Sequence, residues 1–242
     1  MSLRDMIYKR RSCRSYKNEP VDASTIQKIK EFAAKITPLY PDIEIKSEII
    51  DSEHVKCVLP WRSPQVIAIF SEDKEGAYEN VGFVFEQLEL YMQSLGLGVC
   101  WLGMGRLDTD VSAVSSSGGK LKFMMMLAFG YPNGTLYREA KSEFKRRALT
   151  EISDLADERL ECVRLAPSSV NSQPWYFTHD GETIHVYNAG AGFLKLHLGD
   201  MNKMDIGIAL SHVYVSNTDT FRFFKTDAPK LRGKVYVGSF TI

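Results

Sequence analysis

The chain has 242 residues, with 30 Lys+Arg against 30 Asp+Glu, so its formal net charge at pH 7 is zero. Zero net charge argues against a general nucleic-acid or membrane-surface binder, because such proteins carry a basic excess. Hydrophobic residues make up 44% and charged residues 25%, as in a globular protein that buries a core. Four scattered cysteines and five scattered histidines lack metal-site spacing, and no signal-peptide-like run is present, so we expect a cytoplasmic protein without a metal.

The first half of the chain has the pattern of alternating helices and strands. A helix is predicted to begin near Asp22 to Ser24, with apolar residues at helical spacing through Ile36. Buried strands are predicted at 65–71 and 122–130, where the sequence is almost wholly apolar. Between these strands, Tyr78 to Leu95 has the apolar face of a long helix.

The order of elements recurs in the second half. KRRALTEI at 145–152 is similar to KRRSCRSY at 9–16, and DIGIALSHVYV at 205–215 is similar to NVGFVFEQLEL at 80–90. Two diverged copies of one half-fold explain this repetition. Coincidence is the alternative, because helices and strands recur in any chain that mixes them.

The remaining elements complete the expected fold. A second helix is predicted at Ser153 to Arg164, a hairpin at 174–187 around Asp180-Gly181, and a last strand at 234–241. We therefore expect an α+β fold in which one central, mostly antiparallel sheet is flanked by helices, with the two half-repeats forming an internal pseudo-dimer.

Three segments carry polar residues that a hydrophobic core does not require. Each has a functional interpretation and a purely structural alternative. In KRRSCRSY at 9–16, three arginines around Ser12 suit a phosphate group, or form a solvated charge run. In LAPSSVNSQPWYF at 165–177, amides and hydroxyls suit the edge of a flat heterocycle, or cap a turn. In GLGVCWLGMG at 96–105, glycines let a ligand approach the backbone, or end a helix before a strand.

Together these segments closely resemble the FMN-dependent nitroreductases, and among them the duplicated, single-chain type that is TM nitroreductase-like. Members carry segments similar to KRRSCRSY, APSSVNSQPWYF and GLGVCWLGMG, a strand ending in GYP as at 129–132, and a basic K-x-R as in KRR at 145–147. The order differs, because the APSSxNxQPW segment usually follows the first helix and here stands in the second copy. The resemblance therefore implies that 1–147 and 148–242 play the parts of two subunits.

The resemblance also implies an FMN site between the two halves. The residues expected to hold the phosphate and ribityl chain are Arg10, Arg11, Ser12, Lys145 and Arg147. Arg14 is expected at the pyrimidine edge of the ring, and Leu102, Gly103 and Met104 are expected to line the ring. The opposite side would be formed by Pro167, Ser168, Ser169 and Asn171, with Gln173 and Trp175 as structural supports.

The implied function is that of an NAD(P)H-dependent FMN oxidoreductase. A nicotinamide hydride would pass to flavin N5, and a small acceptor such as a nitroaromatic, quinone or enone would be reduced. No catalytic side chain is expected, although Arg14 would stabilise the reduced flavin. The alternatives are a flavin-binding protein without nitroreductase turnover, and a dehalogenase or oxidase on the same scaffold. We expect small-molecule partners only and a functional monomer, with a homodimer as the alternative.

Overall fold

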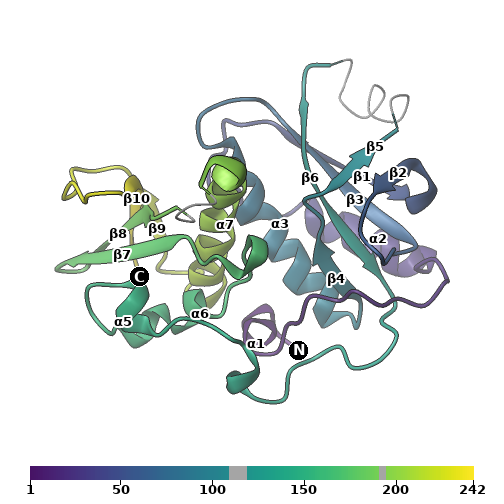
Figure 1. Ribbon diagram of the computed structural model, residues 1–242, viewed down its shortest axis with the longest axis horizontal. Coiled ribbons are helices and arrows are strands. Elements are labelled where there is room, and N and C mark those ends of the chain that lie inside the picture. Colours follow the sequence, from purple (N-terminus) through teal and green to yellow (C-terminus); the bar gives the residue numbers. More distant parts are fainter. Residues whose placement is uncertain (109–118, 191–194) are drawn as a thin grey trace. The chain divides into compact units, whose positions relative to one another are not determined.

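The computed structural model describes residues 1–108, 119–190 and 195–242, with the side chains of 195–198 excepted (Figure 1). The chain divides into two units. The first unit comprises Met1–Ala77 and Gln87–Glu139, and the second comprises Tyr78–Glu86 and Ala140–Ile242. The long helix α3 (Ala77–Ser94) therefore contributes its first turns to the second unit and the rest to the first. The predicted boundary at 147/148 stays a prediction.

The first unit is built on a four-stranded antiparallel sheet. Its strand order is β1 (Ile45–Asp51), β3 (Gln65–Ser71), β6 (Lys122–Gly130) and β4 (Gly98–Trp101). The predictions for 65–71 and 122–130 agree with these bounds, because the two central strands are covered on both faces and so carry nearly continuous apolar runs. Smaller elements complete the unit: α1 (Leu3–Ile7), η1 (Ser52–His54), and a separate ribbon of β2 (Val55–Cys57) and β5 (Gly105–Leu107).

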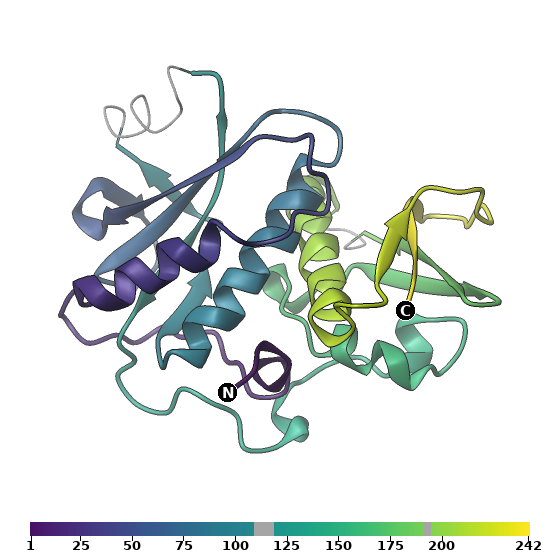
Figure 2. The same cartoon turned by 180° about the vertical axis from the view of Figure 1, so that it is seen from behind.

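Two helices cover one face of this first sheet. Figure 2 shows α2 (Ala23–Ala33) and α3 on the same side of it, and the Phe32 ring stacks on the Tyr91 ring with centroids 4.0 Å apart. α2 begins as predicted, with Asp22 as the N-cap that accepts the Thr25 N–H, but it ends before the predicted Ile36. α3 ends at Ser94, and Gly96 just beyond its C-cap Leu95 has a φ of +86°, a left-handed angle that suits a glycine after a helix.

The second unit carries its own four-stranded antiparallel sheet. The strand order is β7 (Trp175–Asp180), β8 (Thr183–Asn188), β10 (Val235–Thr241) and β9 (Arg222–Phe224). The helix α7 (Lys195–Ser216) contacts β7 and β8. The shorter helical elements are η2 (Lys141–Glu143), α5 (Leu149–Ile152), η3 (Glu158–Leu160), α6 (Glu161–Arg164) and η4 (Ser169–Asn171).

The prediction of one central sheet is wrong. The strands at 65–71 and 122–130 belong to one sheet, whereas the hairpin and the last strand belong to another. An outer strand of each sheet is covered by a segment of the chain itself. Ser12 forms an isolated parallel bridge with Val99 of β4, and Ser153 forms one with Phe177 of β7. These segments protect one of the two edges of each sheet from pairing with a further strand.

The two sheets share one topology. In both, the chain runs strand, strand, long helix, strand, strand, and the spatial order of the strands is first, second, fourth, third. Every strand pairing in the two four-stranded sheets is antiparallel.

The predicted helix from Ser153 to Arg164 is wrong in its first part, since residues 153–157 are not helical and only η3 and α6 form. Asp154 Oδ1 lies 2.6 Å from His179 Nδ1, and Asp157 Oδ2 lies 3.0 Å from His179 Nε2. Asp157 also accepts the Arg159 N–H and so caps η3. Aspartate side chains that bind outside a helix compete with helix formation, which accounts for the extended segment.

Candidate functional site

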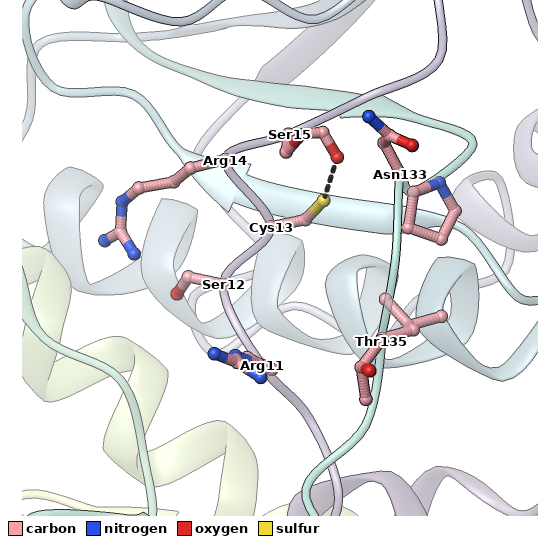
Figure 3. Close-up of a pocket in the computed structure, with 9 residues that line it drawn as sticks. Arg11, Ser12, Cys13, Arg14, Ser15, Asn133 and Thr135 are labelled. Atoms are coloured by element: carbon pink, nitrogen blue, oxygen red, sulfur yellow. Dashed lines mark hydrogen bonds between the residues drawn. The ribbon is translucent and has the colours of Figure 1, made fainter.

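The N-terminal basic segment lies along the edge of the first sheet. The Cys13 N–H donates to the Val99 carbonyl oxygen at 2.9 Å, so the segment is extended beside β4. Figure 3 shows that the side chains of Ser12 and Arg14 point to one side, whereas Cys13 points towards the stretch that carries Asn133 and Thr135. This alternation is that of a strand.

Two motif glycines serve this close packing. A Cβ on Gly98 would lie 2.5 Å from Cys13 Sγ, and a Cβ on Gly130 would lie 2.8 Å from Pro64 Cδ. Gly98 is therefore required for the approach of the N-terminal segment to β4. The glycines Gly98 and Gly130, in the GLG and GYP motifs, therefore have a structural role in this unit, in addition to any contact with a ligand.

A cavity of about 430 Å³ lies along this segment. Its lining residues are Arg11, Ser12, Cys13, Arg14, Ser15, Pro132, Asn133, Thr135 and Leu136. Arg11 and Arg14 are exposed, and two guanidinium groups with a hydroxyl form a donor set suited to phosphate oxygens. The residues present therefore fit the phosphate-bearing part of FMN. Burial raises the pKa of the Cys13 thiol, so this group stays a neutral thiol at neutral pH.

Arg10 has a different place from the one predicted. Its side chain is 1% exposed, and both its Nε and Nη2 donate to Glu89 Oε1, at 3.0 and 2.7 Å. Nη2 also donates to Ser12 Oγ at 3.1 Å. The Glu89 carboxylate balances the charge of Arg10, so a direct phosphate contact by Arg10 is not supported. Arg10 instead orients Ser12.

Glu89 is the centre of a buried network. Besides Arg10, its carboxylate accepts hydrogen bonds from Gln93 Nε2 at 2.8 Å and from Trp101 Nε1 at 2.8 Å. The Gln93 side-chain oxygen in turn accepts the Arg11 N–H at 3.2 Å. The network fixes the backbone at Arg11 and leaves the Arg11 side chain exposed.

The glycine-rich segment after β4 divides into a buried and an exposed part. Leu102 is 5% exposed, packs in the core with Val66 and Met126, and donates its N–H to the Met126 carbonyl oxygen at 2.9 Å. The expectation that the Leu102 side chain lines a flavin ring is thus corrected, because that side chain is core. Gly103 and Met104 are exposed, with Met104 at 59%. They keep their predicted role as a proposal.

The Pro167–Gln173 loop of the second unit has an unusual backbone. Three residues other than glycine have positive φ: Val170 at 47°, Asn171 at 58° and Gln173 at 49°. Such angles are uncommon, most of all for a β-branched residue, and they persist only where surrounding contacts impose them. Ser168 Oγ accepts the Gln173 N–H at 2.9 Å and closes the loop.

The basic segment at 145–147 holds one side of this loop. Arg146 Nη1 donates to Asn171 Oδ1 at 2.6 Å, and Asn171 Nδ2 donates to the Lys145 carbonyl oxygen at 3.0 Å. Gln173 Oε1 accepts the Arg147 N–H at 2.8 Å, in line with its predicted structural role. Lys145 and Arg147 are exposed. Arg146 was not predicted to matter here, because its partner lies 25 residues away.

The second residue missed by sequence reasoning is Asp205 of α7. Its carboxyl oxygens accept the Ser169 N–H at 3.0 and 3.1 Å, and its side chain is 3% exposed. An aspartate at the start of an apolar helical pattern reads as a surface residue, so only tertiary structure reveals this contact.

The structure thus gathers the predicted residues into two groups, each within its own unit. Arg11, Ser12 and Arg14 line one cavity in the first unit. In the second unit, the 145–147 segment contacts the loop that carries Asn171. The part of the chain described by the structure shows no group of three or more His, Cys, Asp or Glu suited to a metal ion, and no helix there is long and apolar enough to cross a membrane.

Comparison with known proteins places the chain in a family. No curated protein matches the sequence. Among solved structures, a putative nitroreductase from Thermotoga maritima MSB8 is similar at TM-score 0.64 and 19% identity, with 99% of this chain and 92% of that chain covered. A nitroreductase family protein from Clostridium difficile 630 is similar at TM-score 0.50 and 18% identity, with 63% and 96% covered. At these identities the likenesses show the fold alone.

The family model described as "Putative TM nitroreductase" matches residues 2–217. This match covers most of the chain and confirms the resemblance found in the motifs. The α+β nitroreductase fold, with antiparallel sheets and helices, is likewise confirmed. The chain therefore belongs to the TM nitroreductase family.

Proposed function

We propose that this chain is an FMN-dependent oxidoreductase of nitroreductase type that takes hydride from NAD(P)H and reduces a small acceptor. The observation that carries the proposal is the cavity lined by Arg11, Ser12 and Arg14 in a member of a nitroreductase family. FMN, when bound, would supply hydride acceptance and electron transfer, which side chains cannot perform. The chain would supply binding, orientation and charge.

The side chains of the first unit would have distinct parts in binding FMN. Arg11 and Ser12 would donate to the phosphate group, with Ser12 held in place by Arg10. Arg14 would place a fixed positive charge near the flavin ring, where reduction adds negative charge. Gly103 and Met104 would lie against the ring. All five residues that would contact FMN are exposed or partly exposed in the protein.

The second unit would add further contacts. Lys145 and Arg147 are exposed cations beside the loop that carries Pro167, Ser168, Ser169 and Asn171. We propose that these residues also bind FMN. Because the Asn171 amide is held by Arg146 and by the Lys145 carbonyl, the loop would be set before the cofactor arrives. Preorganisation lowers the entropic cost of binding.

We also propose that the chain arose by internal duplication, with halves at 1–147 and 148–242. The matching topology of the two sheets supports this proposal. The duplication would let a single chain supply the groups that two subunits supply in a homodimer.

The decisive experiment begins with flavin binding. Purified protein is titrated with FMN, and bound flavin is measured by its visible absorption and by calorimetry. We expect Arg11→Ala to weaken FMN binding by about tenfold or more, as loss of a charge-assisted contact implies. Arg4→Ala is the control, because Arg4 is also an exposed arginine of the N-terminal region but lies outside the cavity. Protein that binds no FMN would refute the proposal.

Turnover is tested next on the flavin-loaded protein. Anaerobic addition of NADH or NADPH should bleach the flavin absorption, and a nitroaromatic, quinone or enone should then restore it. Bleaching by neither nicotinamide would favour a flavin-binding protein without this turnover. Restoration by only one acceptor class would name the substrate class.

A further inference from the structure

We propose that Asp205 is a positioning residue for the Ser168–Gln173 loop, and that the protonation state of its buried carboxyl group sets how firmly the loop is held. The loop's effect on flavin affinity would then depend on pH. This second part rests on the proposed function, whereas the first part concerns the protein alone.

The contacts of Asp205 hold one end of the loop. Both carboxyl oxygens lie within hydrogen-bond distance of the Ser169 nitrogen, and Ser172 Oγ lies 3.5 Å from Oδ2. Ser169 Oγ lies 3.3 Å from Met201 Sδ, one turn earlier on α7. α7 therefore contacts both the backbone and the side chain of Ser169. The carboxyl group of Asp205 is the ionisable group among these contacts.

The loop needs external contacts because its backbone adopts unfavourable dihedral angles. Val170, Asn171 and Gln173 all have positive φ, and Val170 is 73% exposed, so packing of its own side chain does not impose the angle. Arg146 and the Gln173 amide fix the Asn171 end. The Ser169 end depends on Asp205. Weakening that contact should release the strained residues towards ordinary conformations.

The surroundings of Asp205 make its charge variable in the neutral range. Burial raises its pKa to about 8, and hydrogen bonds from Ser169 and Ser172 only partly offset this effect. The charged group that faces it from α3 is Glu86, which raises the pKa further and is itself bonded to His212 Nε2 at 2.8 Å. An ionised carboxylate accepts an N–H more strongly than a neutral carboxyl group. The loop should therefore be held more firmly above the pKa.

The stability of the whole fold should respond in the opposite sense. The folded pKa lies above the unfolded value of 3.8, so the native state binds the proton more tightly. This contribution to stability is complete below the unfolded pKa and is lost as pH rises through the folded pKa. Global stability then falls while the Ser169 contact tightens.

The matching position of the first half carries an asparagine. DIGIALSHVYV and NVGFVFEQLEL align Asp205 with Asn80. An asparagine oxygen can accept the same N–H without a titratable charge. The ionisable residue lies in the copy that carries the Pro-Ser-Ser loop. A pH-dependent contact there would affect the loop that is proposed to bind a ligand.

The test of positioning uses the protein without flavin. The Ser169 amide is followed by NMR in the wild type, Asp205→Asn, Asp205→Ala, and Asp200→Asn as the control on the exposed Asp200–Lys203 pair. We expect the wild-type and control resonances to titrate near pH 8, and Asp205→Asn to give no titration. Asp205→Ala should raise hydrogen exchange at Ser169 by about tenfold or more. Titration that persists in Asp205→Asn, or unchanged exchange in Asp205→Ala, would overturn the proposal.

The link to flavin is tested separately. FMN dissociation constants are measured at several pH values for the wild type and Asp205→Asn. We expect wild-type affinity to rise with pH over the range in which Ser169 titrates, and the variant to lack this rise. A Ser169 titration without change in affinity would overturn the link and leave positioning intact. Absence of any FMN binding would instead overturn the proposed function, while the NMR result would still decide the role of Asp205.

Discussion

Gly82 of α3 and Gly207 of α7 meet at a reciprocal helix crossing within the second unit. A Cβ on Gly82 would overlap the carbonyl oxygen of Met204, and a Cβ on Gly207 would overlap the carbonyl oxygen of Glu79. Met204 and Glu79 each precede the glycine of their own helix by three residues. The contact is therefore symmetric: the glycine of each helix faces the carbonyl group that lies three residues before the glycine of the other helix. The two backbones touch because neither glycine carries a side chain.

We predict that Gly82→Ala and Gly207→Ala each destabilise the protein by about 1–3 kcal/mol, because the added methyl group would press on rigid backbone. The intrinsic helix preference of alanine, about 1 kcal/mol, would offset only part of this loss. Unfolding in urea gives the measurement. Gly199→Ala is the control, since a Cβ there meets no atom within 4 Å and should raise stability slightly. If Gly82→Ala and Gly207→Ala changed stability no differently from Gly199→Ala, the close contact of the two backbones would be contradicted.

A second prediction separates two adjacent arginines. Arg10→Ala should lower the free energy of unfolding by about 3–5 kcal/mol, because it leaves the buried Glu89 carboxylate without its ion pair. Arg11→Ala should change stability by less than about 0.5 kcal/mol, since the Arg11 side chain is exposed. Thermal or urea unfolding of both variants checks this contrast. Similar stability of the two variants would show that the Arg10–Glu89 pair is dispensable.

These two arginines also show what sequence can and cannot predict. The phosphate-binding character of KRRSCRSY follows from its composition, but nothing local tells Arg10 from Arg11. Their difference depends on Glu89, which is 79 residues away. The strands at 65–71 and 122–130 were predictable because local apolar runs define them. The helix predicted from Ser153 to Arg164 failed in its first part, because Asp154 is bonded to His179, a residue of a later strand.

The third prediction concerns the flavin potential. Arg14 is exposed and lines the cavity, so Arg14→Ala should leave the fold intact. It should weaken stabilisation of the reduced flavin by about 1.5–3 kcal/mol, the loss of one charge-assisted contact. The midpoint potential of bound FMN, measured against reference dyes, should therefore fall, while FMN affinity in the oxidised state changes less. An unaltered potential would show that Arg14 is a surface charge without effect on the ring.

The fourth prediction concerns acid stability. Burial alone would raise the pKa of Asp154, but hydrogen bonds from the His179 ring and backbone outweigh it and lower the pKa below 3.8. The pKa of Asp157 is also lowered, against burial, by hydrogen bonds from Arg159 and His179. A carboxyl group whose pKa is lowered on folding stabilises the protein at pH values above its unfolded pKa, and this stabilisation is lost as pH falls through its folded pKa. The wild type should therefore have a higher free energy of unfolding than His179→Gln near neutral pH, and this difference should disappear below about pH 4. Urea unfolding gives the measurement, and a difference in free energy of unfolding that persists in acid would contradict this role of the two aspartates.

The last prediction is one FMN per chain. The second copy lacks groups that a second site would need, since Ala148 and Thr150 stand where Ser12 and Arg14 stand in the first copy. A methyl group cannot donate to a phosphate, and a threonine brings no positive charge to a reduced ring. The donor set of the first copy therefore has no counterpart at 145–152.

The segment that corresponds to the glycine loop reinforces this asymmetry. In the second copy it reads SNTDTFRFF, and Phe221 within it is 8% exposed. Its ring centroid lies 6.1 Å from that of Phe83 and 5.8 Å from that of Phe240, so an aromatic cluster fills this position. Bound flavin per polypeptide, with molecular mass from light scattering on the same sample, gives the stoichiometry. We expect one flavin per chain at every protein concentration. Two flavins per chain would show that the second copy keeps a working site despite Phe221.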